Sequence, residues 1–177
     1  MPLAVAAALA AASMPAVIKD PANDVSGPLD LRRAALKRTS DGRLRATLTF
    51  AGKVTPSTLL ASSGPPGSAC MRVWTDPDAD PAATRPDRLV CVTARSEDEL
   101  RAGVFAQSDA GLPRRVGSAS VKGSSSGRSL VTRISQSSLG RPELIRFAVE
   151  STRPGCKRTA CIDIVPDSGA ARRFRLR

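Results

Sequence analysis

The sequence predicts an all-β protein, an antiparallel two-sheet β-sandwich of about eight or nine short strands that forms one domain over residues 17–177. Short segments in which polar and apolar residues alternate recur along the chain, and clusters of Gly, Pro, Ser and Asp separate them. No long run with helical periodicity follows the first residues. These observations together favour hairpins over helices.

The first expected hairpin joins a strand over residues 29–36 to a strand over 43–50. Its turn over 39–42 ends in the step Asp41-Gly42, which supplies the positive φ that such a turn needs. The second strand alternates between apolar and polar residues, as expected for one buried face. Further strands are expected over residues 70–75, 89–94, 100–107, 116–121, 130–134 and 144–150, with a last one near 173–176.

Four cysteines fall into two local pairs, Cys70 with Cys91 and Cys156 with Cys161. Four cysteines allow three connectivities, and two local disulfides are the expected one. A zinc site made by all four thiolates would require short knuckles, whereas 20 and 4 residues separate the members of the two pairs. If Cys70 faces Cys91 on neighbouring antiparallel strands, Arg72 is expected opposite Leu89.

The first 16 residues resemble a signal peptide, because the apolar segment 2–12 precedes a zone of small residues. The segment lacks the basic n-region of a signal peptide, and a truncated start would explain that absence. It is short for a membrane-spanning helix, and an Ala-rich helix is the alternative interpretation. A secreted, extracellular protein is therefore expected, in agreement with disulfide formation.

Composition excludes several kinds of catalytic or cofactor site. The chain has no histidine, which removes Ser-His-Asp triads, His-ligated zinc and an axial His ligand for haem. Aromatic residues make up 3%, so the core must be largely aliphatic, and the single tryptophan, Trp74, is either a core residue or a platform for a sugar. The Gly- and Ser-rich segment 122–128 lacks the G-K-[ST] arrangement of a phosphate-binding loop, so no nucleotide is expected.

Two acidic segments near the ends of the domain suggest a calcium site. Asp20 and Asp24 precede the first expected strand, and Asp163 and Asp167 follow the last cysteine. Chain termini commonly lie close together in compact domains, so these four carboxylates are candidate ligands of one Ca²⁺ ion. The alternative is that they form turns with their own backbone. A third acidic segment, 76–87, has carboxylates at calcium-loop spacing but lacks the required Gly, and a solvated loop is expected there.

Positive charge is concentrated in the second part of the chain. Residues 1–109 hold 13 basic and 12 acidic groups, a balance of +1, whereas residues 110–177 hold 14 and 4, a balance of +10. Coding bias towards arginine is the alternative explanation for the choice of Arg over Lys. The candidate residues for binding an anionic polymer are Arg114, Arg115, Arg172, Arg173, Arg175 and Arg177.

Four motifs resemble a family of small secreted proteins from GC-rich bacteria. They are D-P-x-x-D-V-S-G-P-L-D-L at residues 20–31, P-D-x-L-V-C-V-T at 86–93, S-x-L-G-R-P at 137–142 and C-x4-C-I-D-x-x-P-D-S-G at 156–169. More remotely, the acidic start and the D-x-x-P-x-x-G ending are similar to DOMON-like ligand-binding sandwiches. The resemblance implies a secreted β-sandwich of uncharacterised function.

The function expected from these features is a secreted, non-enzymatic binding or adhesion module. Its expected partner is an anionic cell-envelope polymer or an extracellular protein, and the lack of stacking aromatics argues against nucleic acid. Two alternatives remain open. One is a glycoside hydrolase that uses a carboxylate pair from the acidic segments. The other is a protease inhibitor that presents the loop between Cys156 and Cys161.

Overall fold

Eleven β-strands and two short helical turns make up the regular structure of the computed structural model, which describes residues 14–20, 25, 27–108, 111–156, 161–167 and 170–176. The turns are α1 (Pro56–Leu59) and the 3₁₀ turn η1 (Gln136–Leu139). The described segments contain no helix with the length and apolar character needed to cross a membrane. The strands are β1 (Ala16–Lys19), β2 (Leu31–Arg38), β3 (Leu44–Phe50), β4 (Ser68–Trp74), β5 (Arg88–Ala94), β6 (Leu100–Ser108), β7 (Gly111–Gly123), β8 (Ser129–Ile134), β9 (Leu144–Thr152), β10 (Ile162–Val165) and β11 (Arg172–Arg175).

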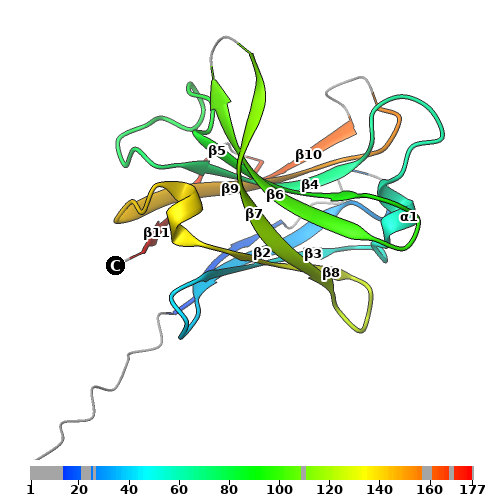
Figure 1. Cartoon of the computed structure of the whole chain (residues 1–177), viewed down its shortest axis with the longest axis horizontal. Coiled ribbons are helices and arrows are strands. Elements are labelled where there is room, and N and C mark those ends of the chain that lie inside the picture. The colour runs from blue at the N-terminus through cyan, green and yellow to red at the C-terminus, as the bar shows by residue number, and fades with distance from the viewer. Residues whose placement is uncertain are drawn as a thin grey trace, which may run out of the picture.

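All of these strands belong to one antiparallel sheet, with the order β1-β2-β3-β8-β7-β6-β5-β4-β9-β10 and with β11 also paired to β9. The sheet curls until β10 contacts β2 and β11 contacts β1, so it is nearly closed and barrel-like (Figure 1). The all-β prediction is confirmed. The expected division into two separate sheets is not confirmed, because a continuous hydrogen-bonded path runs through β7.

The strand β7 is the link between the two halves of the sheet. Its first part pairs with β6, and its last part, from Ala119 onward, pairs with β8. Ala119 is a partner of Ala102 on one side and of Ile134 on the other. A strand that changes partner along its length turns the sheet without breaking it, and register shifts between β6 and β7 add local bending.

The core lies inside the curled sheet and is mostly aliphatic, as the composition predicts. On β3, residues at every second position are buried, which is the pattern of one inward face. Thirteen-residue β7 differs, because its first six residues are all exposed where it leaves the core with β6 (Figure 1). The largest core side chains that are almost fully buried include Phe50, Phe147, Leu31, Leu36, Leu44, Leu59, Met71, Leu130, Ile134 and Leu139.

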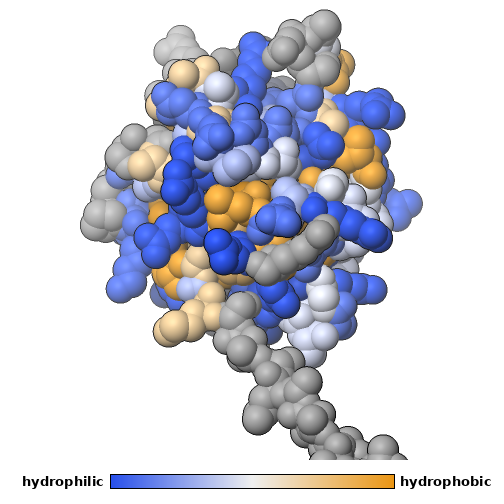
Figure 2. Space-filling view, turned by 90° about the vertical axis from the view of Figure 1, so that its left-hand side faces the viewer, coloured by the Kyte–Doolittle hydropathy of each residue, from blue (hydrophilic) through white to orange (hydrophobic). Residues whose placement is uncertain are grey.

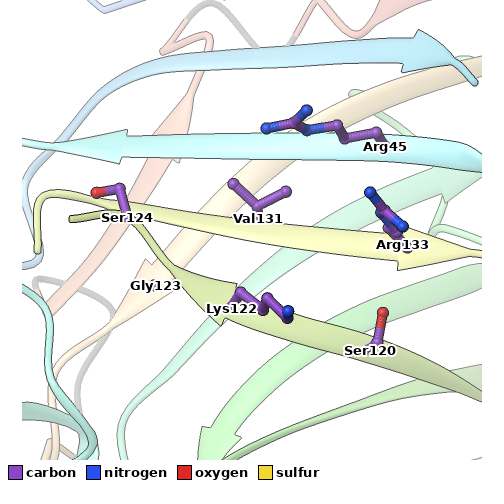
Figure 3. A pocket seen from close by; sticks show the side chains of 7 residues that line it. All are labelled: Arg45, Ser120, Lys122, Gly123, Ser124, Val131 and Arg133. Carbon is purple, nitrogen blue, oxygen red and sulfur yellow. The ribbon is translucent and has the colours of Figure 1, made fainter.

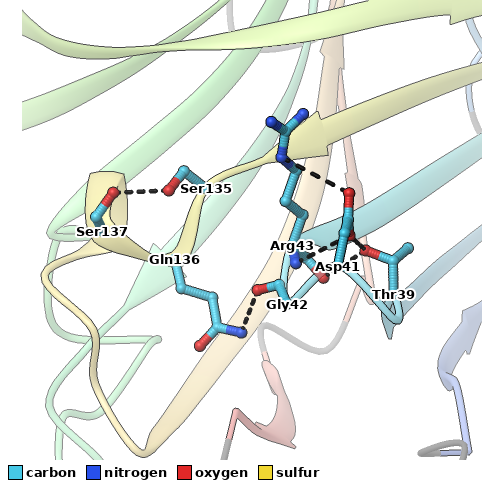
Figure 4. Close-up of polar contacts among 7 residues, drawn as sticks. All are labelled: Thr39, Asp41, Gly42, Arg43, Ser135, Gln136 and Ser137. Carbon is cyan, nitrogen blue, oxygen red and sulfur yellow. Dashed lines mark hydrogen bonds and ion pairs between the residues drawn. The ribbon is translucent and has the colours of Figure 1, made fainter.

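The hairpin between β2 and β3 has the predicted turn. Gly42 has φ +74°, the left-handed conformation that favours glycine. Asp41 accepts hydrogen bonds from the Thr39 hydroxyl and from the Arg43 amide, and Gln136 of η1 donates to the Gly42 carbonyl at 2.7 Å (Figure 4). The hairpin tip is thus fastened to η1, a segment 94 residues later in the chain.

Both disulfides have the predicted pairing, Cys70 with Cys91 and Cys156 with Cys161. The predicted register of β4 and β5 is also confirmed, since Cys70 lies opposite Cys91 and Arg72 lies opposite Leu89. Two disulfides indicate that the protein folds in an oxidising environment.

Glu150 is a mostly buried acid on β9 whose ionisation opposes folding. Burial raises its pKa above the usual value, and the nearby Arg72 guanidinium, at 3.8 Å, only partly offsets this effect. The folded protein therefore favours the protonated carboxyl more than the unfolded chain does. Stability that is present at low pH is expected to fall as the pH rises through the pKa of Glu150.

The variant Glu150→Gln is therefore expected to gain stability relative to the wild type as the pH is raised from about 4 to about 7. Urea unfolding at several pH values measures this difference. Glu97→Gln, at an exposed position, serves as the control and is expected to follow the wild type. Parallel stability curves for Glu150→Gln and the wild type would contradict the assignment.

Candidate metal site at the sheet seam

The seam where the sheet almost closes is held by side chains rather than by a strand ladder. Ser151 of β9 and Asp163 of β10 lie opposite each other. Asp163 Oδ2 accepts a hydrogen bond from the Leu31 amide at 2.6 Å, and the Ser151 hydroxyl donates to the Leu29 carbonyl at 2.5 Å. These two bonds join the β9/β10 edge to the start of β2.

An acidic cluster lies at this seam. Asp20 follows β1 directly, Asp163 is in β10, and Asp167 comes two residues after β10. One carboxylate oxygen from each lies within 4.8 Å of the others. Three of the four predicted ligands are thus brought together, from segments more than 140 residues apart. The fourth, Asp24, lies outside the described residues.

Burial differs among the three acids. Asp163 is 1% exposed and Asp20 is 7% exposed, whereas Asp167 is exposed to solvent. Neighbouring carboxylates repel one another, and burial strengthens that repulsion because water screens it less. A cation bound among the three oxygens would neutralise this charge.

The spacing of the oxygens suits calcium. Two ligands of one Ca²⁺ ion lie at most about 5 Å apart, twice the usual calcium–oxygen distance, so oxygens within 4.8 Å of one another can share an ion. Mg²⁺ demands stricter, octahedral geometry. Calcium also takes more ligands than three carboxylates supply singly, and bidentate binding, water or backbone carbonyls complete such sites.

A fourth acid near the seam has a different partner. Asp30 is 4% exposed and pairs with Arg32, whose guanidinium nitrogen lies 2.9 Å from its Oδ2. The amide of Asp20 also donates to the Arg32 carbonyl. Arg32 therefore balances the charge of Asp30.

Of the six arginines predicted to bind an anionic polymer, the five in the described part of the chain fall into two separate groups. Arg114 and Arg115 are exposed on the part of β7 that leaves the core. Arg172, Arg173 and Arg175 are exposed on β11, and Arg177 lies outside the described residues. Four strands, β6, β5, β4 and β9, separate β7 from β11 in the sheet, and Figure 1 shows the first part of β7 apart from β11.

Trp74 is not available as an exposed platform for a sugar. It is 1% exposed, and its indole nitrogen donates to the Thr84 carbonyl at 3.1 Å. Alternation along β4 places it on the side opposite Met71 and Val73, beneath the loop over residues 75–87. The acids of this loop form turns as expected, since Asp76 and Asp80 accept from backbone amides two residues later.

The inhibitor alternative depends on the loop inside the Cys156–Cys161 ring, and residues 157–160 lie outside the described part of the chain.

Two hollows on the outer surface were not predicted from the sequence. One, of about 350 Å³, lies over β3, β8 and β7 and has Arg45, Lys122 and Arg133 in its lining (Figure 3). The other, of about 610 Å³, is more apolar and is lined in part by Leu89, Phe105 and the Cys70–Cys91 disulfide. The first hollow combines β3 with β7 and β8, which come much later in the chain, so only knowledge of the strand order could have revealed it. The second is formed by the consecutive strands β4 to β7.

The surface seen in Figure 2 faces to the left in Figure 1. Hydrophilic side chains cover most of it and surround a small apolar area near its centre (Figure 2). Isolated apolar areas of this kind are normal on folded proteins.

No family model matches the chain, and no curated protein matches it either.

Proposed function

We propose that the protein is a secreted, non-enzymatic binding module whose nearly closed sheet is stabilised at its seam by a calcium ion. Secretion is supported by the signal-like segment over residues 1–16 and by the two disulfides. Its partner is an anionic polymer or a protein outside the cell.

The observation that carries the proposal is the convergence of Asp20, Asp163 and Asp167 within 4.8 Å. Asp163 is fixed by its hydrogen bond from the Leu31 amide, so the seam and the ion site share a residue. An ion held by β1, β10 and the segment after β10 would cross-link the two edges of the sheet. Calcium would therefore stabilise the fold without taking part in a reaction.

The burial of the same acids favours a structural site over a hydrolase. A glycosidase must bring a sugar between its two carboxyl groups. Asp163 is 1% exposed and Asp20 is 7% exposed, which leaves little surface for such a substrate. We therefore favour the calcium-stabilised binding module over the hydrolase.

Calcium is expected to raise the thermal unfolding midpoint of the purified, oxidised protein. At a free concentration of about 100 times the dissociation constant, the stabilisation is about 2.7 kcal/mol, or roughly 5–10 °C for a chain of this size. Thermal unfolding is compared in calcium, magnesium and EDTA. Asp167→Asn, at an exposed position, is expected to reduce the shift, and Asp98→Asn is the matched exposed control.

A midpoint that is the same in calcium and in EDTA would overturn the calcium part of the proposal. An equal shift in Asp167→Asn and the wild type would remove Asp167 from the site.

A further inference from the structure

The half of the sheet that contains β1, β2, β3, β8 and the end of β7 has a strongly basic outer surface. Residues with outward side chains alternate with buried core residues along β2, β3 and β8. Six of the outward residues are Lys or Arg, and none of the outward residues of these strand segments is Asp or Glu. We call this surface the cationic face, and it consists of Lys19, Arg33, Lys37, Arg45, Lys122 and Arg133.

Strand register places these cations next to one another. Arg45 of β3 lies opposite Lys37 of β2 on one side and opposite Arg133 of β8 on the other. Lys19 of β1 lies opposite Arg33 of β2. Neighbouring strands are about 4.8 Å apart, so Lys37, Arg45 and Arg133 form a row of positive charges across three strands.

Such an arrangement costs stability, because like charges directly opposite each other in a sheet repel. Within the described part of the chain, none of the six cations forms an ion pair with a carboxylate. Arg133 of this face lies close enough to the hairpin tip to act on Asp41. The pKa of Asp41 is lowered mainly by the hydrogen bond from Thr39, with smaller contributions from Arg43 and Arg133. The cationic face therefore has unsatisfied positive charge.

The chemistry of the face also includes hydroxyl groups. The hollow of about 350 Å³ has Ser120 and Ser124 in its lining beside Arg45, Lys122 and Arg133 (Figure 3). Thr47, Thr49 and Ser129 are outward neighbours on β3 and β8. No outward residue of these strand segments is aromatic, so bases have nothing to stack on. A face that offers both cations and hydroxyls matches a polymer that carries both acidic groups and hydroxyls.

We propose that the cationic face binds a linear acidic polysaccharide, which lies across β2, β3, β8 and β7 with its acidic groups on Lys37, Arg45, Arg133 and Lys122. This inference rests on the proposed binding function and names its surface and ligand class, but it does not depend on the calcium site. Arginine pairs with carboxylates in a fork-like, bidentate geometry, and serine and threonine hydroxyls bond sugar hydroxyls.

Binding is tested with immobilised polygalacturonate and two variants that each lose three positive charges. The first changes Arg45, Lys122 and Arg133 to Thr, which suits a strand. The matched control changes Arg172, Arg173 and Arg175 of β11 to Thr. We expect the first variant to bind at least about tenfold more weakly than the wild type and the control to bind almost normally. The single variant Arg133→Thr, at an exposed position, is expected to weaken binding in the same direction and guards against misfolding of the triple variant.

Ionic strength gives a second readout. Raising it from about 0.1 M to about 1 M shortens the Debye length from about 10 Å to about 3 Å, and binding of the wild type is expected to fall strongly. Binding of polygalacturonate by the first variant is also expected to depend less on salt than binding by the control.

Three results would overturn the inference. An equal loss of polygalacturonate binding in both triple variants would show that binding responds to net charge alone. A loss of binding in the β11 control alone would place the site on β11, while the binding function itself would stand. Tighter binding to double-stranded DNA than to polygalacturonate at equal salt would replace the polysaccharide by nucleic acid. Failure of the wild type to bind polygalacturonate overturns the cationic face as a polysaccharide site, while the calcium-dependent unfolding shift tests the other part of the proposed function separately.

Discussion

In calcium, the variant Asp163→Ala is expected to unfold with a free energy about 4 kcal/mol below that of the wild type. The change removes the acceptor for the Leu31 amide, which leaves a backbone donor without its partner at the seam and costs about 1–3 kcal/mol. It also removes a calcium ligand, and the lost ligand stabilisation is about 2.7 kcal/mol at 100 times the dissociation constant. Urea unfolding in calcium and in EDTA separates the two contributions, because only the second requires the ion.

Asp163→Asn makes a sharper comparison, because asparagine keeps an oxygen that can accept from Leu31 while the negative charge is lost. In EDTA the change removes one of three clustered charges, so the variant is expected to be at least as stable as the wild type. In calcium the variant lacks a charged ligand and is expected to be less stable. The order of stability thus reverses between the two conditions. If Asp163→Asn and the wild type had the same order of stability in calcium and in EDTA, Asp163 would act only through its hydrogen bond with the Leu31 amide.

Trp74→Ala is expected to lower the free energy of unfolding by about 3–5 kcal/mol, the usual cost of truncating a buried aromatic residue. Trp74 is 1% exposed, and its indole nitrogen donates a hydrogen bond to the Thr84 carbonyl. This bond anchors the loop over residues 75–87 to the tryptophan side chain. Arg72 also lies over the ring, 5.2 Å from its centre, and contributes a cation–π contact. Chemical unfolding measures the loss.

Trp74→Phe separates packing from hydrogen bonding. It keeps an aromatic ring but cannot donate to Thr84, so its cost is expected to lie well below that of alanine. The loop over 75–87 is expected to become more sensitive to proteases in both variants, since its anchor is weakened. An alanine variant with wild-type stability would contradict the assignment of Trp74 as a buried anchor.

Local chemistry explains which parts of the fold could be predicted from the sequence. The β4/β5 register followed from two cysteines and strict alternation, because a disulfide between neighbouring strands leaves one consistent pairing. The turn at Gly42 followed from the Asp-Gly step. In both cases the determining residues are close together in the chain.

Two strands were missed for identifiable reasons. In β10 the apolar residues Ile162 and Ile164 are only half-buried, and the buried position between them holds Asp163, so the usual pattern is reversed. The four-residue strand β1 begins at Ala16, the last residue of the expected signal segment. Because that segment is almost entirely apolar, no alternation of polar and apolar residues marks the start of a strand there. Burying an acid in β10 is consistent with the role we propose for the seam.

Closure of the sheet and formation of the cationic face depend on long-range order. Nothing near Ala119 in the sequence indicates that β7 changes partner from β6 to β8 at that residue. Lys37, Arg45 and Arg133 become neighbours only because β2, β3 and β8 are adjacent in the sheet. The charge excess in residues 110–177 instead indicates Arg114, Arg115 and the arginines of β11 as the binding residues. In contrast, the acidic cluster could be anticipated, because its residues come from the two ends of the domain.

Calorimetric titration of calcium into the EDTA-treated, dialysed protein tests the proposed seam site most directly. The wild type is expected to bind one calcium ion per chain, and binding is expected to be lost or greatly weakened in Asp163→Asn and in Asp20→Asn. Asp98→Asn is expected to bind as the wild type does. No calcium binding by the wild type, or equal binding by all four proteins, would contradict a calcium ion at the seam of the sheet.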